Sequence, residues 1–223
     1  MFESCVDSLE AALASEHGGA GRIELCASLD VGGLTPNAAL IERCVAQLRI
    51  PTFVMVRPRA GDFVYSADEA RAMSRDIRTV ARAGAHGIVF GALTPDGTVD
   101  REVTRRLIDA ARPLPVTFHR AMDVTRDPIE ALDVVIDFGV QRVLTSGGAS
   151  TALEGADTIA TLVKRAADSL TVIAGGNVRV ENVAEIVRRT GVREVHAWVA
   201  KSEESGVAQT EAVAALVSRF KRT

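Results

Sequence analysis

The sequence predicts a single TIM-type (β/α)8 barrel, an α/β fold that covers residues 1–223 as one domain. Short β-rich runs alternate with amphipathic helical runs along the whole chain, and Gly, Pro and Asp mark the junctions. Strands that alternate with helices of this length imply right-handed βαβ units and a parallel sheet. Eight such units, with no linker between them, close naturally into a barrel. The alternative is a doubly wound open sheet, but VDSLEAA follows the first strand in place of the GxGxxG typical of that fold.

The expected strands are short runs of β-branched, aromatic and other apolar residues, bounded by turn-forming residues. In chain order they are residues 2–6, 22–26, 52–57, 86–90, 116–119, 142–145, 170–174 and 194–198. The stretches between them have the apolar periodicity of helices that pack one face on a sheet. These helices are expected at residues 8–17, 37–48, 67–83, 101–111, 128–138, 153–167, 179–189 and 210–220.

Composition excludes several classes of function. Hydrophobic residues make up 47% and charged residues 25%, as in soluble globular proteins. The net charge of −3 argues against a nucleic-acid partner, and no apolar run reaches the ~20 residues that span a membrane. The N-terminal MFESCVDSLE lacks the features of a secretory signal. Three cysteines are too few for a disulfide framework, so a reducing, cytoplasmic setting is expected.

The alternation of residues along each strand predicts which side chains face the barrel lumen. Strand residues point alternately to the lumen and to the surrounding helices, and the helix-facing set should be apolar. In the second strand Ile23 and Leu25 are apolar, which directs Glu24 and Cys26 inward. The same argument directs inward Glu3, Cys5, Thr117, His119, Glu194 and His196. A polar lumen is unfavourable unless its members pair with one another or form a site.

Several strands end in polar residues at the face where TIM barrels place their active sites. These residues are Arg57, Arg59, Asp62, His119, Asp123 and His196. Any one of them could form a structural ion pair between two loops, because such pairs also produce polar clusters. Polar ends on this many strands together indicate a ligand site.

Two glycine-containing loops add to this face. TSGGAS (145–150) follows the sixth strand and AGGNV (174–178) the seventh, and the residues of interest are Ser146, Gly147, Gly175 and Gly176. Adjacent glycines allow backbone N–H groups to approach an anion, although glycines alone are better explained by tight turns. Together with Arg57, Arg59 and Arg120 at the same face, they predict a small anionic ligand.

Cys5 and Cys26 lie on neighbouring strands with inward parity. Neighbouring strands are ~4.8 Å apart, so the two thiols could hold one soft ion such as Cu(I). On spacing alone, packing in the core is the default interpretation, because cysteine is often buried as a small hydrophobe. Cys44 is expected to serve packing only. Lys201 is the one lysine near a strand end, which leaves a Schiff-base aldolase as a weakly supported class.

Long stretches of the chain resemble the CutC family of copper-homeostasis proteins. They include CVDSLEAA, GGAGRIELCASLDVGGLTPN, VMVRPRAGDFVYS, GIVFGALTPDGTVD, VTFHRAMD, RVLTSGG and EVH. The resemblance implies a TIM-type barrel, a cytoplasmic protein with a role in copper handling, and Cu(I) ligands at Cys5 and Cys26. No nucleotide cofactor is expected. The chain departs from the family pattern at Trp198, where Ser is usual, at Asn177, where a third glycine is common, and at Asn37.

Two functional hypotheses follow. The first is a copper-binding protein that holds Cu(I) at Cys5 and Cys26, as the resemblance implies. The second is an enzyme acting on a small carboxylated or phosphorylated substrate. In this alternative His119 is the general acid/base, oriented by Asp123 or Glu24, and Arg57 and Arg120 neutralise the substrate. The sequence leaves the question of a homo-oligomer open.

Overall fold

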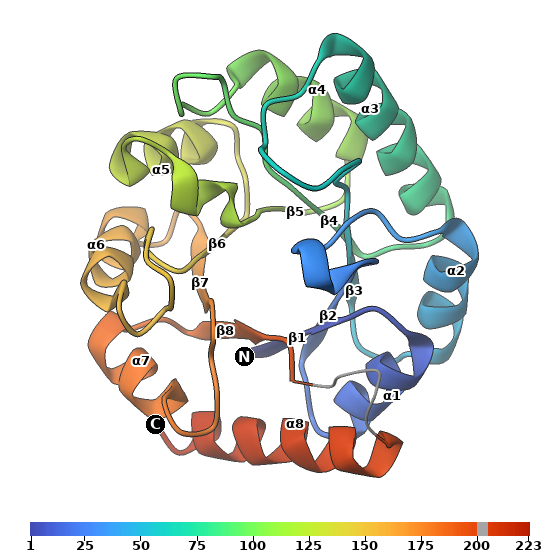
Figure 1. Cartoon of the computed structure of the whole chain (residues 1–223), viewed down its shortest axis with the longest axis vertical. Coiled ribbons are helices and arrows are strands. Elements are labelled where there is room, and N and C mark those ends of the chain that lie inside the picture. Colours follow the sequence, from blue (N-terminus) through green and yellow to red (C-terminus); the bar gives the residue numbers. More distant parts are fainter. Residues whose placement is uncertain (200–204) are drawn as a thin grey trace.

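The computed structural model describes residues 1–199 and 205–223, and within them eight parallel strands form a closed barrel in the order β1 to β8. The strands are β1 (Phe2–Val6), β2 (Arg22–Leu25), β3 (Thr52–Met55), β4 (Gly87–Phe90), β5 (Val116–Phe118), β6 (Arg142–Thr145), β7 (Thr171–Gly175) and β8 (Glu194–Ala197). Figure 1 shows them as a ring viewed end-on, with the helices outside. The predicted (β/α)8 fold is confirmed.

Each strand is followed by one α-helix. The helices are α1 (Leu9–His17), α2 (Ala38–Gln47), α3 (Ala67–Arg82), α4 (Arg101–Ala111), α5 (Pro128–Asp137), α6 (Ala156–Ala166), α7 (Val183–Thr190) and α8 (Gly206–Lys221). Two short 3-10 helices, η1 (Leu29–Val31) and η2 (Arg120–Val124), lie in loops and were not predicted. No helix in the described ranges is both long enough and apolar enough to cross a membrane. Lys201 lies outside the described residues.

Side-chain caps fix several helix starts, and three predicted boundaries were wrong. The helix expected at 179–189 begins only at Val183, because the Arg179 N–H bonds the Asn182 side chain in a turn before the helix. The helix expected at 210–220 begins at Gly206, because Ser205 caps the Ala208 N–H. The helix expected at 153–167 begins at Ala156, after a longer loop.

The barrel separates two apolar regions. The larger one, between strands and helices, contains Ile23, Leu25, Phe118 and Val195. The smaller one lies in the lumen and consists of Cys5, Cys26, Phe53, Met55 and Val89. These two sets confirm the predicted alternation of inward and outward residues.

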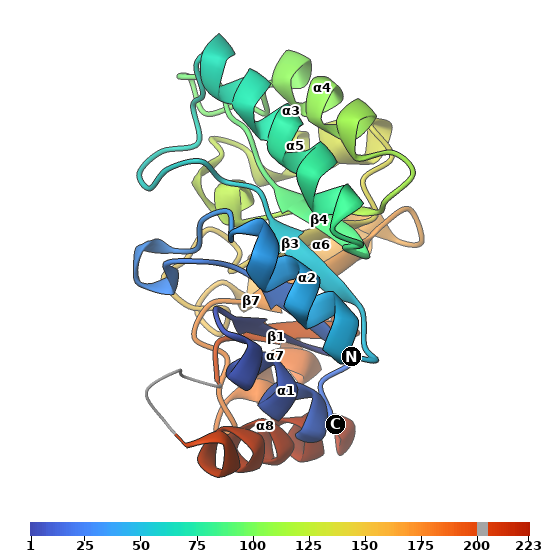
Figure 2. The same cartoon turned by 90° about the vertical axis from the view of Figure 1, so that its right-hand side faces the viewer.

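The loops that follow the strands gather on one side of the barrel (Figure 2), opposite the start of β1. Arg57, at the end of the third strand, connects two of them. Its guanidinium donates to the carbonyl oxygens of Val31 (3.1 Å), Gly33 (3.2 Å) and Gly61 (2.8 Å). The loop containing η1 and the loop before α3 are therefore held together around this end of the barrel.

Candidate functional site

A network of buried charges fills the lower lumen. Arg22, only 2% exposed, pairs with Glu3 and with Glu194, at 2.6 Å from Nη2 to Oε2. Arg142 approaches the same Glu194 oxygen at 3.7 Å. Both guanidinium groups lie over the Phe53 ring, 5.1 and 5.0 Å from its centre. Because isolated buried charges are very unfavourable, these residues stabilise the lumen only as a group.

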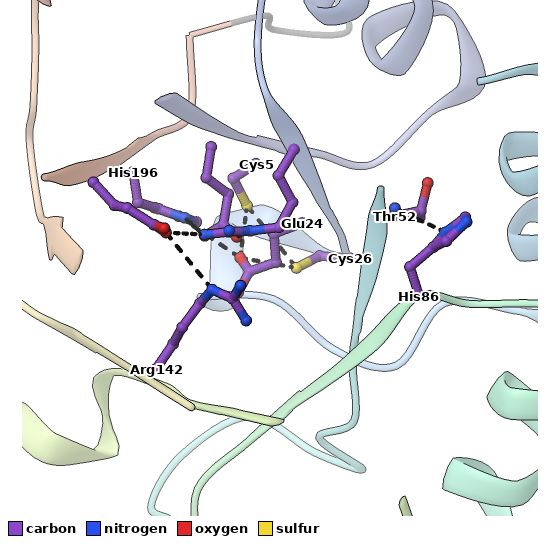
Figure 3. Close-up of polar contacts among 10 residues, drawn as sticks. Cys5, Glu24, Cys26, Thr52, His86, Arg142 and His196 are labelled. Atoms are coloured by element: carbon purple, nitrogen blue, oxygen red, sulfur yellow. Dashed lines mark hydrogen bonds and ion pairs between the residues drawn. The ribbon is translucent and has the colours of Figure 1, made fainter. Parts of the chain in front are cut away.

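The Glu24 carboxylate lies at the centre of the next layer (Figure 3). Its Oε2 accepts hydrogen bonds from the Cys5 thiol (3.2 Å) and the Cys26 thiol (3.6 Å). Nε2 of His196 lies 3.6 Å from the same oxygen, and its Nδ1 lies 2.8 Å from Oε1 of Glu3. Three strands therefore bring two thiols, a carboxylate and an imidazole together, as the alternation predicted.

The charges of this layer are strongly coupled. Burial alone would raise the pKa of Glu3, but His196 and Arg22 outweigh it and lower that pKa to about 2. Burial likewise opposes the charged form of His196, yet Glu24, Cys5 and Glu3 raise its pKa well above the usual value. For Glu24 burial dominates, and its pKa is raised despite the attraction of His196. His196 is thus an imidazolium between two carboxyl groups.

The two thiols suit a soft metal ion. The Sγ atoms of Cys5 and Cys26 are 3.9 Å apart, and both cysteines are free. Metal–thiolate bonds are ~2.3 Å long for zinc, so one ion can contact two sulfur atoms separated by up to about 4.6 Å. The hydrogen bond with Cys26, burial and Glu24 raise the pKa of Cys5 well above its usual value. Cys5 lowers the pKa of Cys26, but burial and Glu24 outweigh it and raise that pKa to about 11. A bound metal would therefore have to displace protons.

A cavity of about 280 Å³ lies above this layer, at the loop side of the barrel. Its floor consists of Cys5, Glu24 and His196. Its rim consists of Arg57, His119, Arg120 and Arg179, with Leu29, Phe63 and Trp198 completing the wall. The cavity thus joins Cys5, one of the two predicted thiols, with Arg57 and Arg120, two of the three predicted arginines.

His119 is buried (3% exposed) and faces this cavity. Its Nδ1 accepts a hydrogen bond from the Ala121 N–H at 3.1 Å, so the proton of the neutral ring is on Nε2. Burial and the charges of Arg57 and Arg120 lower its pKa to about 3. Ala121 therefore orients the ring, and no contact of His119 with Asp123 or Glu24 is found among the described residues.

Asp123 binds the glycine loop after β6. Its Oδ1 accepts from Thr145 Oγ1 (2.5 Å), Ser146 N (2.8 Å) and Gly148 N (3.3 Å), while Oδ2 accepts from Arg120 (2.7 Å). Arg120 also donates to Ser146 Oγ at 3.0 Å. The N–H of Gly147 bonds Thr145 Oγ1 at 2.8 Å. The loop expected to receive an external anion therefore already holds a carboxylate of the protein.

The glycines after β7 are required by close packing. A Cβ on Gly175 would lie 2.6 Å from Leu144 Cδ1, and one on Gly176 would lie 2.9 Å from Ser146 Cβ. Gly176 also has a φ of +109°, which other residues rarely adopt. Asn177 has a φ of +53°, and asparagine is one of the few other residues that tolerate this conformation.

Arg59 and Asp62 lie outside the cavity lining. Arg59 pairs with Glu69 (2.6 Å) and with Asp62 (3.0 Å), in the loop before α3. The Asp62 side chain is largely exposed, and that of Arg59 is partly buried. They stabilise the loop that carries Phe63, one wall of the cavity.

Sequence reasoning did not identify all the residues of the site. Arg22 is two residues before Glu24 in β2, and Arg142 is two residues before Leu144 in β6. The alternation of inward and outward residues could therefore have placed both arginines in the lumen. Arg179 follows the glycine loop after β7 directly, which is the signal that could have placed it on the rim. Nothing in the sequence places Phe63 against His119, whose ring centres are 4.9 Å apart.

The fold and the site define a TIM-barrel protein with a thiol, carboxylate and imidazole cluster beneath an arginine-lined cavity. Residues 1–201 match the family model described as CutC family, and the chain belongs to this family.

The relatives and the solved structures agree with this assignment. The chain is 46% identical over 207 residues to the copper homeostasis protein cutC homolog of Mus musculus, covering 93% of this chain and 76% of the mouse protein. The human homolog is 45% identical over the same length and coverage. A crystal structure of CutC from Streptococcus agalactiae has a TM-score of 0.84 at 32% identity, covering 88% of this chain and 97% of that one. An N-(5'-phosphoribosyl)anthranilate isomerase from Pyrococcus furiosus shares the fold, with a TM-score of 0.64 at 18% identity over 100% of this chain and 99% of that one.

Proposed function

We propose that this protein takes part in copper homeostasis in a reducing, cytoplasmic setting and binds Cu(I) between Cys5 and Cys26. The observation that carries the proposal is the 3.9 Å separation of two free thiols in the lumen, at a cavity that Cys5 lines. Thiolate is a preferred ligand of Cu(I). The names of the mouse and human relatives support the same role.

The neighbouring groups fit this cargo. Ligand atoms of Cys5, Glu24 and His196 lie within 4.8 Å of one another. Two thiolates with one Cu(I) carry a net charge of −1, which the imidazolium of His196 and the arginine of the layer below can balance. Glu24 accepts hydrogen bonds from both thiols, so it is placed to receive a proton when the metal displaces it.

An anaerobic titration of the reduced protein with Cu(I), against a competing chelator, tests the proposal. We expect one Cu(I) per chain, and loss of this binding in the double variant Cys5→Ser, Cys26→Ser. Cys44→Ser is the matched control, because Cys44 is a free, buried cysteine in α2, in the region between strands and helices. Unchanged Cu(I) binding by the double variant would rule out the site.

The alternative is an enzyme with His119 as general acid/base, and the observation in its favour is that His119 lines the cavity. A general base needs a free lone pair on the atom that faces the substrate. Here the Ala121 N–H occupies Nδ1, and Nε2 carries the proton. The ring is therefore better suited to donate a hydrogen bond than to accept a proton.

A further inference from the structure

The rim of the cavity contains two buried hydrogen-bond donors that lack acceptors. Nε2 of His119 and Nε of Arg57 have no hydrogen-bond partner in residues 1–199 and 205–223. The two residues are 3% and 5% exposed, and both line the cavity. An unpaired buried donor is unfavourable, and both side chains line the same cavity, so we look there for a ligand that supplies an acceptor.

The positive charge of the rim is only partly compensated. Arg120 is paired with Asp123. Arg57 donates to three backbone carbonyls, and Arg179 to the carbonyl of Val178 (2.8 Å). Neither of these two forms an ion pair with any residue that the structure describes. An acceptor that also carries negative charge therefore fits this rim best.

The floor of the cavity offers a hydrogen-bond acceptor, whereas the rim offers donors. Oε1 of Glu24 is a buried acceptor without a partner in the described part of the chain. A hydroxyl or ammonium group on the ligand would satisfy it. The cavity, at about 280 Å³, is just below the ~300–1,000 Å³ typical of pockets for larger ligands. A short molecule with different groups at its two ends matches both the size and the polarity.

We propose that the cavity binds a small hydroxylated or aminated oxyanion. Its carboxylate or phosphate group lies between Arg57, His119 and Arg179, and its hydroxyl or ammonium group faces Glu24. The oxyanion would be held by donors of Arg57, His119 and Arg179, whereas Cu(I) would be held by the thiols of Cys5 and Cys26.

The fluorescence of Trp198 can report directly on ligand binding in the cavity. It is the only tryptophan of the chain and lines the cavity. Its indole Nε1 is also buried, with no partner found in the described residues. Tryptophan fluorescence, excited at a wavelength that Tyr65 hardly absorbs, therefore reports on the cavity. The experiment titrates the full-length, reduced, copper-free protein with acetate, glycolate, inorganic phosphate and glycerol 3-phosphate, with chloride at equal ionic strength as control.

We expect saturable fluorescence changes, with glycolate binding more tightly than acetate, or glycerol 3-phosphate more tightly than phosphate. The pair that responds identifies the oxyanion, and the preference within the pair reports on Glu24. No saturable response to any of the four probes beyond that to chloride would overturn the proposal. Equal affinity within both pairs would overturn the assignment of Glu24.

Matched variants locate the site. His119→Asn keeps an acceptor for the Ala121 N–H but removes the Nε2 donor, and Arg179→Gln removes an exposed cation. Each should weaken probe binding by roughly tenfold or more, because a hydrogen bond to a charged group contributes at least that much affinity. Arg165→Gln, which removes an exposed arginine that does not line the cavity, should bind like wild type. Equal weakening by Arg165→Gln would contradict the site.

The copper proposal and the oxyanion proposal can be tested separately. The double variant Cys5→Ser, Cys26→Ser should retain probe binding, and His119→Asn should retain Cu(I) binding. Loss of both activities in either variant, with the fold intact by circular dichroism, would show that the two ligands do not use separate atoms and would contradict the proposed arrangement.

Discussion

His119 and His196 are both buried at the same cavity, yet they have opposite charge states. His119 is surrounded by arginines, and burial together with Arg57 and Arg120 lowers its pKa to about 3. Burial acts on His196 in the same direction, but Glu24 and Glu3 reverse the effect and raise its pKa well above the usual value. The charge of each imidazole is therefore set by its neighbours rather than by its depth.

The neutral state of His119 predicts a pH-dependent stability. Its folded pKa of about 3 lies below the usual 6.5, so between these values the unfolded chain binds the proton more readily. Its stabilising contribution is complete above 6.5 and is lost as the pH falls toward 3, with a slope of up to ~1.4 kcal/mol per pH unit. Urea unfolding across this pH range should show that the free energy of unfolding falls less steeply with decreasing pH in His119→Asn than in wild type. Parallel profiles would contradict the assigned charge state.

Arg22 should be essential to the fold. It is 2% exposed and pairs with both Glu3 and Glu194. Arg22→Met removes one cationic partner from the buried Glu3 and from the partly buried Glu194, and we expect the free energy of unfolding to fall by about 3–5 kcal/mol. Arg165→Met, which removes an exposed pair with Asp133, is the control and should change it far less. Chemical denaturation measures both, and similar losses would refute the role assigned to Arg22.

At the scale of elements, periodicity predicted every strand and α-helix of the described residues but neither 3-10 helix. The apolar, helix-facing side of a barrel strand and the apolar face of its helix are both visible in a short stretch of sequence. The starts of α6, α7 and α8 were wrong by several residues. These boundaries depend on caps and turns, such as Asn182 bonding the Arg179 N–H, which compete with the apolar pattern at each helix end.

Gly175, the last residue of β7, packs closely against side chains of β6 and β8. An added methyl group would lie 2.6 Å from Leu144 and 3.4 Å from His196. We expect Gly175→Ala to lower the free energy of unfolding by about 1–3 kcal/mol through overpacking and to weaken Cu(I) binding by moving His196. Gly206→Ala, with open space around it at the start of α8, should be neutral or stabilising. Thermal unfolding of the two variants provides the comparison, and equal stability would exclude the packing argument.

At the scale of the whole molecule, the site could be predicted only in part. Alternation along single strands brought Cys5, Glu24 and His196 to one lumen, because inward parity is a local property. The hydrogen-bond partners given above for Arg57, and two of those of Asp123, are backbone groups of loops, and loop paths leave no periodic signal in the sequence. For this reason the arginine expected to meet a ligand also holds two loops, and the aspartate expected to orient His119 holds a third.

Cu(I) should stabilise the entire barrel if it is bound where we propose. A ligand that binds only the folded state adds stability that grows with its concentration, by ~2.7 kcal/mol at 100 times Kd. Because the Cys26 pKa is about 11 and that of Cys5 is also raised, binding must release protons and should strengthen as the pH increases. Anaerobic thermal unfolding should show a copper-dependent rise in Tm for wild type and Cys44→Ser. The same rise in the Cys5→Ser, Cys26→Ser variant would place the metal elsewhere.

The carboxylate of Asp123 in the loop after β6 has a consequence for selectivity. Because it is part of the chain, it competes with any dissolved anion at an effective concentration of millimolar or more. It accepts hydrogen bonds from the N–H groups of Ser146 and Gly148. An anion that binds through these N–H groups would have to displace the Asp123 carboxylate. An anion at the cavity site proposed above therefore has arginine and imidazole groups to bind, and not the N–H groups of Ser146 and Gly148.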